Sequence, residues 1–245
     1  MTDYNGQLDV LFKEWEAASI ANGDDVISKD GLMKMKDVDV NEMWDKSPVR
    51  VMFLLKDQPN GGGDDIRNWL TLPDSNRFAR RNREVRGTFL KRLAFLLYGF
   101  VYGNTEFGTI KKEDAIKCFL ETPFALVETK KQSGGTSVSN RVYINRYRDF
   151  LLKEIEILSP NIIVCCGGPQ HHFVLHSLYN IETLETIDGN VHYDPEKKVV
   201  IVYSPHPRAH CSHEKFFEGA MWHYGIFLKH YPGWPDIHMT SCPGL

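Results

Sequence analysis

The sequence lacks a pair of cysteines separated by two residues, a long apolar run, and a strong net charge. Without a CxxC pair, a structural zinc or iron–sulfur site is not expected. Without an apolar run of about 18 residues, no transmembrane helix is expected. The net charge of −3 gives no global sign of nucleic-acid binding, although a local patch can still provide it.

Cysteine is scarce and oddly placed for a disulfide framework. The chain has five cysteines, and two of them, Cys165 and Cys166, are adjacent in an apolar run. This usage suits a reduced, cytoplasmic protein. The first residues, MTDYNGQLDVLFKEWEAA, are polar and acidic and do not resemble a secretory signal.

The chain has the length and composition of one globular domain, with 245 residues of which 42% are hydrophobic. We expect a mainly helical lead-in over residues 1–47, because its apolar side chains have helical spacing. The residues spaced for packing in this lead-in are Leu8, Leu11, Phe12, Trp15 and Ile20.

Four short apolar runs predict buried strands, and amphipathic patterns between them predict helices. The runs are RVMFLL (50–55), FALVE (124–128), NIIVCC (161–166) and VVIVY (199–203). The helical patterns cover residues 87–100, 146–158, 168–178 and 212–231. Strands that alternate with helices imply right-handed crossovers. The sequence therefore predicts an α/β protein, a three-layer α/β/α sandwich with a four-stranded parallel sheet.

Polar or glycine-rich residues follow each predicted strand. The strand-end segments are KDQPNGGGDD (56–65), ETKKQSGGTS (128–137), GGPQHH (167–172) and SPHPRAH (204–210). The carboxyl ends of parallel strands meet at one edge of a sheet, and ligands bind there in open α/β folds. We therefore expect the four segments to form one site.

KDQPN (56–60) and HPR (206–208) follow the first and the last predicted strand. This arrangement resembles the uracil-DNA glycosylase superfamily. Its members carry a water-activating motif of the form GQDPY, GEAPG or GINPG after one strand and HPS after a later one. FALVET, IIVCCGGPQ and the two phenylalanines of HCSHEKFF are similar to further family segments, so the resemblance covers residues 48–230. It implies the strand order 2-1-3-4 and a DNA glycosylase, a hydrolase of base-excision DNA repair.

The chain departs from the family pattern at four positions, which lie in three motifs. Gln58 stands where GQDPY has its aspartate, and Asp57 stands where it has glutamine. Glu128 replaces the asparagine that reads uracil, and Arg208 replaces the serine of HPS. The four cysteines of the iron–sulfur members have no counterpart here. The resemblance therefore implies no cofactor and does not support uracil specificity.

The catalytic roles implied by the resemblance fall on three residues. His206, fixed between Pro205 and Pro207, is expected to donate to the leaving base. The alternative is a turn whose imidazole only caps backbone groups. Asp57 can take a proton from water, whereas Gln58 can only orient it. The alternative for this pair is a polar loop start before the Asn60-Gly61 turn signal.

Substrate contacts are expected from residues of the same loops. Glu128 can accept a hydrogen bond from an exocyclic amino group, unless it caps a helix or loop. Trp69 can stack on a base, unless it is a core anchor. The candidate substrate-binding residues are Asn60, Trp69, Glu128, Arg208 and His210.

Phosphate contacts are expected from glycines and from a basic segment, residues 76–92. The alternatives are a plain flexible loop for the glycines and, for the arginines, a solvated helix start paired with Asp64 and Asp65. The candidate phosphate-binding residues are Gly61, Gly62, Gly63, Arg80, Arg81 and Arg83.

Two other classes of function stay open. His206, His210, Cys211 and His213 have spacings that can gather zinc, as in a metallohydrolase. The fold can also serve as a non-catalytic module that binds nucleic acid or a nucleotide. On the glycosylase interpretation we expect a cytoplasmic monomer with no metal and no membrane partner. Its expected partner is nucleic acid, which the resemblance implies to be DNA, or a nucleotide.

Overall fold

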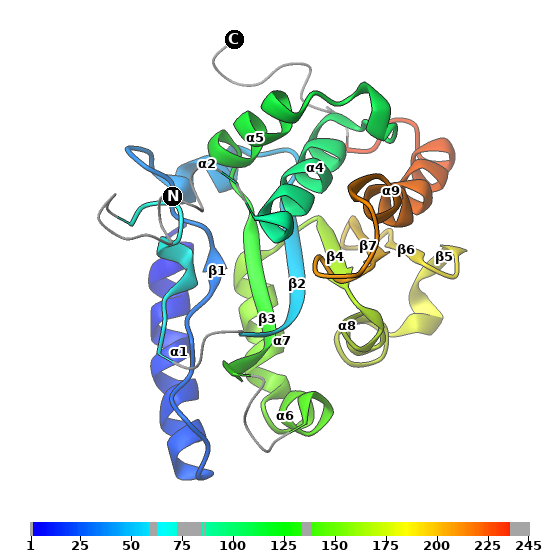
Figure 1. The fold of residues 1–245 in the computed structure, drawn as a ribbon. Coiled ribbons are helices and arrows are strands. Elements are labelled where there is room, and N and C mark those ends of the chain that lie inside the picture. Colours follow the sequence, from blue (N-terminus) through cyan, green and yellow to red (C-terminus); the bar gives the residue numbers. More distant parts are fainter. Residues whose placement is uncertain (1, 59–62, 73–84, 86, 134–138, 236–245) are drawn as a thin grey trace.

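The computed structural model describes residues 2–58, 63–72, 85, 87–133 and 139–235, with only the backbone of residues 57, 58 and 133. In this part of the chain one mixed sheet has the order β1-β3-β2-β4-β7-β6-β5 (Figure 1). Its strands are β1 (Gly31–Leu32), β2 (Val51–Gln58), β3 (Ala125–Ser133), β4 (Ile162–Cys166), β5 (Glu185–Asp188), β6 (Val191–Asp194) and β7 (Val199–Ser204).

The four predicted runs form the consecutive strands β3, β2, β4 and β7, and each neighbouring pair is parallel. The prediction of a four-stranded, wholly parallel sheet is nevertheless wrong. The sheet has seven strands across the described residues, and β1, β6 and β5 pair antiparallel at its two sides. The added strands have two to four residues each, too few to produce an apolar run.

Strands β2 and β3 continue beyond their predicted ends. Asp57 pairs with Lys130, and Gln58 pairs with Ser133 across a shift of register. The expectation that Asp57, Gln58 and Glu128 end or follow their strands is therefore wrong, because the polar continuations still find ladder partners. A register shift increases local twist and changes where the next side chains point, a device found beside active sites.

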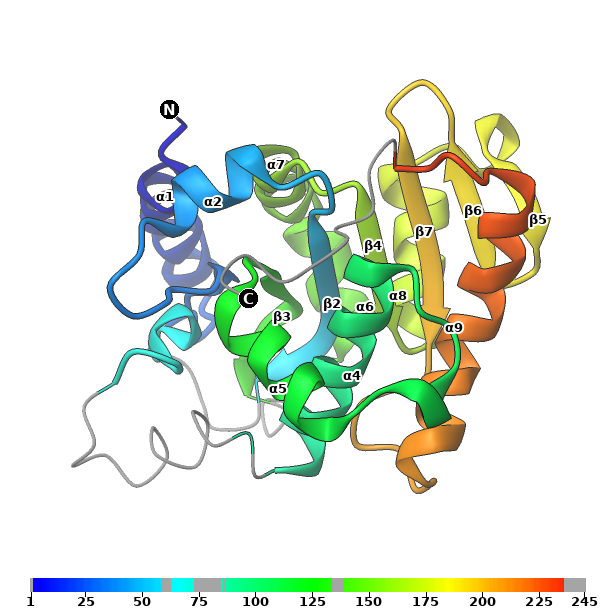
Figure 2. The same ribbon diagram turned by 90° about the horizontal axis from the view of Figure 1, so that it is seen from above.

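Helices cover both faces of the sheet and give three layers (Figure 2). One face carries α4 (Thr88–Tyr102), α5 (Lys112–Glu121) and α9 (His213–His230). The other carries α1 (Tyr4–Ala21), α2 (Val40–Lys46), α6 (Asn140–Arg146), α7 (Arg148–Leu158) and α8 (Gly168–Phe173). Short turns are η1 (Ile66–Asn68), η2 (Phe107–Thr109), the π-helical η3 (Val174–Leu178) and η4 (Ile181–Thr183).

The alternating residues of each central strand supply both cores. Phe53 and Leu55 face the α4 layer, whereas Met52 and Leu54 face the α1 layer. This burial on two faces explains the continuous apolar runs. No helix in the described ranges has the length and hydropathy needed to cross a bilayer.

Helix α1 packs through the predicted residues except Ile20. Leu8, Leu11, Phe12 and Trp15 are buried, but Ile20 is 62% exposed. The buried stripe continues four residues after Trp15 with Ser19, which is fully buried. Its hydroxyl donates to Asp25 O (2.8 Å), so a polar residue takes the inward position that the apolar pattern gave to Ile20.

Candidate functional site

The carboxyl ends of β3, β2, β4 and β7 lie at one edge of the sheet, because the four strands are parallel. At this edge Leu55 pairs with Glu128, and Cys166 pairs with Ser204. Among the residues that the structure describes, three connections from this edge can be followed: residues 63–72 after β2, the turn after β4, and the His206 loop (residues 205–211) after β7. Each of them is held by a buried polar side chain.

Arg92 of α4 holds the His206 loop. Its side chain is 3% exposed, and its guanidinium donates to Pro207 O (2.9 Å), Ala209 O (2.7 Å) and Cys211 O. The guanidinium carbon also lies 4.9 Å from the centre of the Phe216 ring. Arg92 belongs to the basic segment, so the expectation that this segment is a phosphate patch or a solvated helix start is wrong for Arg92.

The His206 ring has a defined hydrogen bond inside this loop. Its Nδ1 accepts from the Arg208 N–H at 3.2 Å, and its carbonyl accepts from Ala209 N at 2.7 Å. In the neutral ring, an accepting Nδ1 leaves the proton on Nε2. The side chain is half-buried. The turn predicted as the alternative role of this segment is therefore present, and its geometry leaves Nε2 as the donor atom.

The two candidate residues after His206 are exposed. The Arg208 guanidinium lies over the Phe89 ring, 5.8 Å from its centre, and His210 faces solvent. Phe89 belongs to the first turn of α4, so Arg208 covers the junction of α4 with the His206 loop. Both side chains are accessible to a ligand placed against this loop.

Glu128 lies inside β3 and is 2% exposed. Residues two apart on a strand share a face, so Glu128 lies on the side of Leu126, toward the α4 layer. Its backbone N–H donates to Asp30 Oδ2 at 2.7 Å. Glu128 is therefore an interior residue of β3 and does not stand at the end of this strand. It shares the α4 side of the sheet with Arg92.

The turn after β4 depends on a glycine. Gly167 has φ +126°, and a Cβ there would lie 2.8 Å from Gln170 Oε1. Gln170 is 1% exposed and donates through Nε2 to Thr129 Oγ1 at 3.3 Å. The Thr129 hydroxyl in turn donates to Lys56 O at 2.9 Å. These bonds tie α8 to the ends of β2 and β3. The glycine turn signalled this position in the sequence, but nothing signalled the part played by Gln170.

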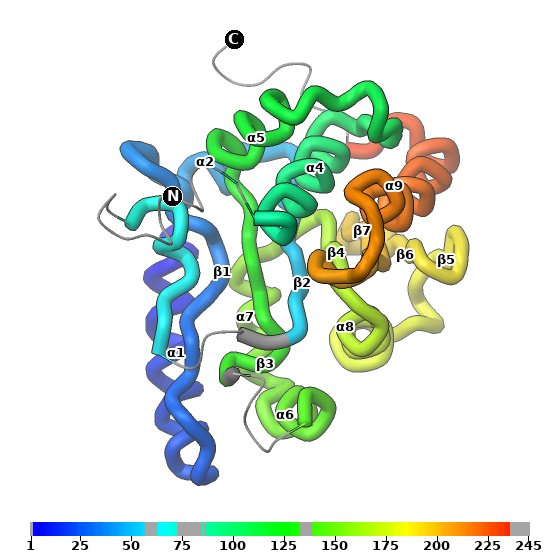
Figure 3. Tube along the Cα trace, viewed as in Figure 1, coloured from blue at the N-terminus to red at the C-terminus, as the bar shows by residue number. Residues whose placement is uncertain are grey.

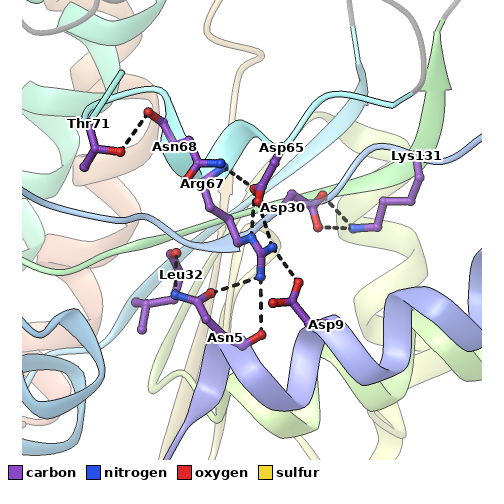
Figure 4. Close-up of polar contacts among 9 residues, drawn as sticks. All are labelled: Asn5, Asp9, Asp30, Leu32, Asp65, Arg67, Asn68, Thr71 and Lys131. Carbon is purple, nitrogen blue, oxygen red and sulfur yellow. Dashed lines mark hydrogen bonds and ion pairs between the residues drawn. The ribbon is translucent and has the colours of Figure 1, made fainter. Parts of the chain in front are cut away.

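Arg67 anchors the chain that returns after β2 (Figure 4). Its side chain is buried, with Nε donating to Asp65 Oδ1 (2.8 Å) and Nη2 donating to Asp9 Oδ1 (2.7 Å). Asn5 of α1 completes the set, with its two oxygens 3.4 Å from Nη1. Burial alone would raise the pKa of Asp65, but the Arg67 hydrogen bonds and charge hold it below the usual value. Asp65 thus pairs with Arg67.

A fully buried charge cluster supports β3 beneath α1. Figure 4 shows two of its members, Lys131 and Asp30. Lys131 Nζ lies 2.5 Å from Asp30 Oδ1 and 2.7 Å from Glu154 Oε2, and all three side chains are inaccessible. Burial and then the Asp30 charge raise the pKa of Glu154 well above its usual value. The pKa of Lys131 is raised by the two acids in spite of its burial. We infer that Lys131 is the cation, Asp30 the anion and Glu154 a protonated carboxyl, so that the cluster has no net charge.

Two further predicted contacts can be placed. Trp69 is half-buried and packs against the core of the α4 face, which favours the core-anchor interpretation. The Gly63 N–H donates to Ile27 O at 3.2 Å, so this donor already has a backbone partner. Asn60, Gly61, Gly62, Arg80, Arg81 and Arg83 lie outside the described residues, as do the side chains of Asp57 and Gln58.

The zinc alternative finds no ligand set in the part of the chain that the structure describes. No group of three or more His, Cys, Asp or Glu side chains is arranged there to hold a metal ion. Cys211 and His210 are exposed on the loop, and the Arg92 guanidinium, a cation, lies 3.7 Å from the Cys211 sulfur.

Comparison with protein-family models finds no match to the chain, and comparison with curated proteins finds none either.

Proposed function

We propose that the protein hydrolyses the N-glycosidic bond of a damaged or deaminated base that is flipped out of DNA. Water attacks C1′ of the sugar, the bond from C1′ to the base nitrogen breaks, and the bonding electrons leave with the base. The water proton passes to Asp57 if this residue is the base, and finally to the released base. His206 donates a hydrogen bond to the base as negative charge develops on it.

The observation that supports the proposal most directly is the hydrogen bond from Arg208 N–H to His206 Nδ1. A donor to a leaving base needs its proton on the nitrogen that faces the substrate. Because Nδ1 accepts, the neutral ring carries this proton on Nε2. A neutral imidazole suffices, since stabilisation of a developing anion requires an oriented N–H dipole.

The contacts that Arg92 makes beneath the His206 loop also suit a catalytic role for His206. A catalytic group must be held close to its productive geometry by packing and by hydrogen bonds behind it. Arg92 binds three carbonyls of the His206 loop from the buried side. This arrangement restrains the backbone that follows His206 and leaves the outer side of the loop accessible.

We assign base recognition to Glu128, on the α4 side of the sheet. Glu128 shares the α4 side with Arg92, and a carboxylate there accepts from the exocyclic amino group of a cytosine-like or adenine-like base. Uracil has no such group. The proposal therefore favours an amino-bearing damaged base over uracil.

A base-release screen tests the proposal. Purified protein is incubated with duplex and single-stranded oligonucleotides that carry deaminated, alkylated or mismatched bases, and strand breaks are scored after alkali. His206→Ala should abolish release, while oligonucleotide binding and the thermal midpoint stay unchanged. The matched control is His172→Ala, which removes an exposed histidine from α8.

Asp57→Asn and Gln58→Ala, made separately, identify the residue that activates or orients the attacking water. Loss of activity only in Asp57→Asn identifies a proton acceptor, whereas loss only in Gln58→Ala identifies an orienting amide. If no base is released although oligonucleotides bind, the proposal fails and the chain is a non-catalytic binding module.

A further inference from the structure

A cavity lies at the opposite end of the sheet from the His206 loop. Its walls come from chain that precedes β2 and β4, from the β6–β7 turn, and from the segment after α9, and it has a volume of about 710 Å³. Figure 2 shows the segment after α9, in red, passing beside the β6–β7 turn. Cavities of roughly 300–1,000 Å³ accommodate small organic ligands.

The frame of this cavity is well ordered by its own contacts. Asn161 joins two walls, since its Nδ2 donates to Pro48 O and its Oδ1 accepts from Arg50 N, both at 2.7 Å. Trp234 is 8% exposed and meets the Phe227 ring edge-on, with the ring centres 5.2 Å apart. The Tyr231 ring stacks on Phe227 with the centres 5.0 Å apart. The wall after α9 is therefore a packed aromatic surface.

The lining is cationic. It includes Arg50, Lys197, Lys198 and His230, and none of the described residues that line it is an aspartate or glutamate. His230 lies in the last turn of α9, where the helix dipole alone favours a cation. Lys197 places its ammonium over the Tyr179 ring, 4.5 Å from its centre. Neither a helix dipole nor an aromatic ring accounts for the positions of the other two cations, Arg50 and Lys198.

Arg50 and Lys198 are placed to receive an anion. Arg50 uses one donor, Nε, on Ser159 O at 2.9 Å, which leaves the two amino groups of the guanidinium. Lys198 is exposed at φ +54°, a backbone conformation usually taken by glycine or asparagine. The carboxylates near these cations accept hydrogen bonds from other groups. Asp45, whose charge acts on Arg50, accepts from the Tyr4 hydroxyl and from Thr2 N. Asp194 accepts from Lys197 N (2.9 Å), and Glu185 accepts from the Tyr231 hydroxyl.

We propose that this cavity binds a small organic phosphate with an aromatic ring, as in a nucleoside monophosphate. The phosphate is held by Arg50 and Lys198, and the ring lies against Tyr231 and Trp234. A guanidinium fork matches the geometry of a phosphate, and a lysine adds a point charge. This inference is independent of base release, because its residues lie at the other end of the sheet.

Calorimetric titration tests the inference, with adenosine monophosphate, adenosine and inorganic phosphate as separate probes. The monophosphate should bind, and each of the other two should bind at least about tenfold more weakly, because each lacks one half of the contacts. A 5′-phosphorylated dinucleotide distinguishes a free nucleotide from the end of a strand as the source of the phosphate.

Arg50→Ala and Lys198→Gly should each weaken the monophosphate by about tenfold or more, the usual effect of a lost charge-assisted hydrogen bond. Glycine at position 198 keeps the left-handed backbone while the charge is removed. The matched control is Lys215→Ala, an exposed lysine at the other end of α9. Absent binding, or equal affinity in all four proteins at unchanged thermal midpoints, overturns the inference.

Discussion

Replacement of Glu154 by glutamine should make the protein more stable than the wild type as the pH rises. Glu154 is inaccessible, and its carboxyl contacts Lys131 Nζ at 2.7 Å beside the charged Asp30. A protonated carboxyl and an amide have nearly the same shape, and both are neutral. Near pH 5 the substitution should therefore change the free energy of unfolding by no more than about 1 kcal/mol, the usual worth of one altered hydrogen bond.

The sign of this pH dependence follows from the number of protons that the folded and unfolded states bind. The pKa of Glu154 is raised in the folded chain above its ordinary value of 4.5, so the folded state keeps a proton that the unfolded state releases. This contribution to stability is complete below pH 4.5 and is lost as the pH rises toward the folded-state pKa. The slope is at most about 1.36 kcal/mol per pH unit. Between pH 4.5 and 7 the wild type therefore loses up to about 3.4 kcal/mol that the glutamine variant keeps.

Urea unfolding of both proteins at pH 5, 6, 7 and 8 measures this difference. The free energy of unfolding of Glu154→Gln, relative to wild type, should rise by at least about 1 kcal/mol between pH 5 and 7. Glu156→Gln, an exposed change in the same helix, should give a flat difference. Parallel profiles for wild type and Glu154→Gln would refute the inferred protonation of Glu154.

Four further predictions concern the same structure. Lys131→Met should cost about 3–5 kcal/mol in urea unfolding, because Asp30 is left as an uncompensated buried charge; a cost below about 1 kcal/mol would contradict the cluster. Gly167→Ala should lower the thermal midpoint markedly, since its Cβ meets Gln170 at 2.8 Å, while Gly168→Ala, with no atom within 4 Å, should be tolerated. Arg92→Lys should shift the His206 imidazole resonances and lower stability by about 1–3 kcal/mol, and an unchanged NMR spectrum would argue against its hold on the loop. Burial lowers the pKa of His171 to about 4, so the neutral ring stabilises the fold above pH 6.5 and this stability is lost as the pH falls toward 4; His171→Gln should flatten that acid limb of the unfolding curve.

The central strands and the longest helices are determined by local pattern. A strand buried on both faces needs an apolar side chain at every position, and the runs at 50–55, 161–166 and 199–203 meet this need. The helices α4, α7 and α9 follow from apolar residues at helical spacing. The position of His206 beyond the last parallel strand follows in the same way, because a proline-flanked segment cannot continue a buried strand.

Tertiary structure decided which charged residues are buried. Arg92 and Lys131 read as surface residues in the sequence, since lysine and arginine are almost never buried unless paired. Their partners, the Cys211 carbonyl and Asp30, are 119 and 101 residues away, so no local window contains both members. The same distance in sequence hides the antiparallel strands at the two sides of the sheet. Short strands such as β1 exist because a neighbour supplies their hydrogen bonds, and only the folded chain brings that neighbour beside them.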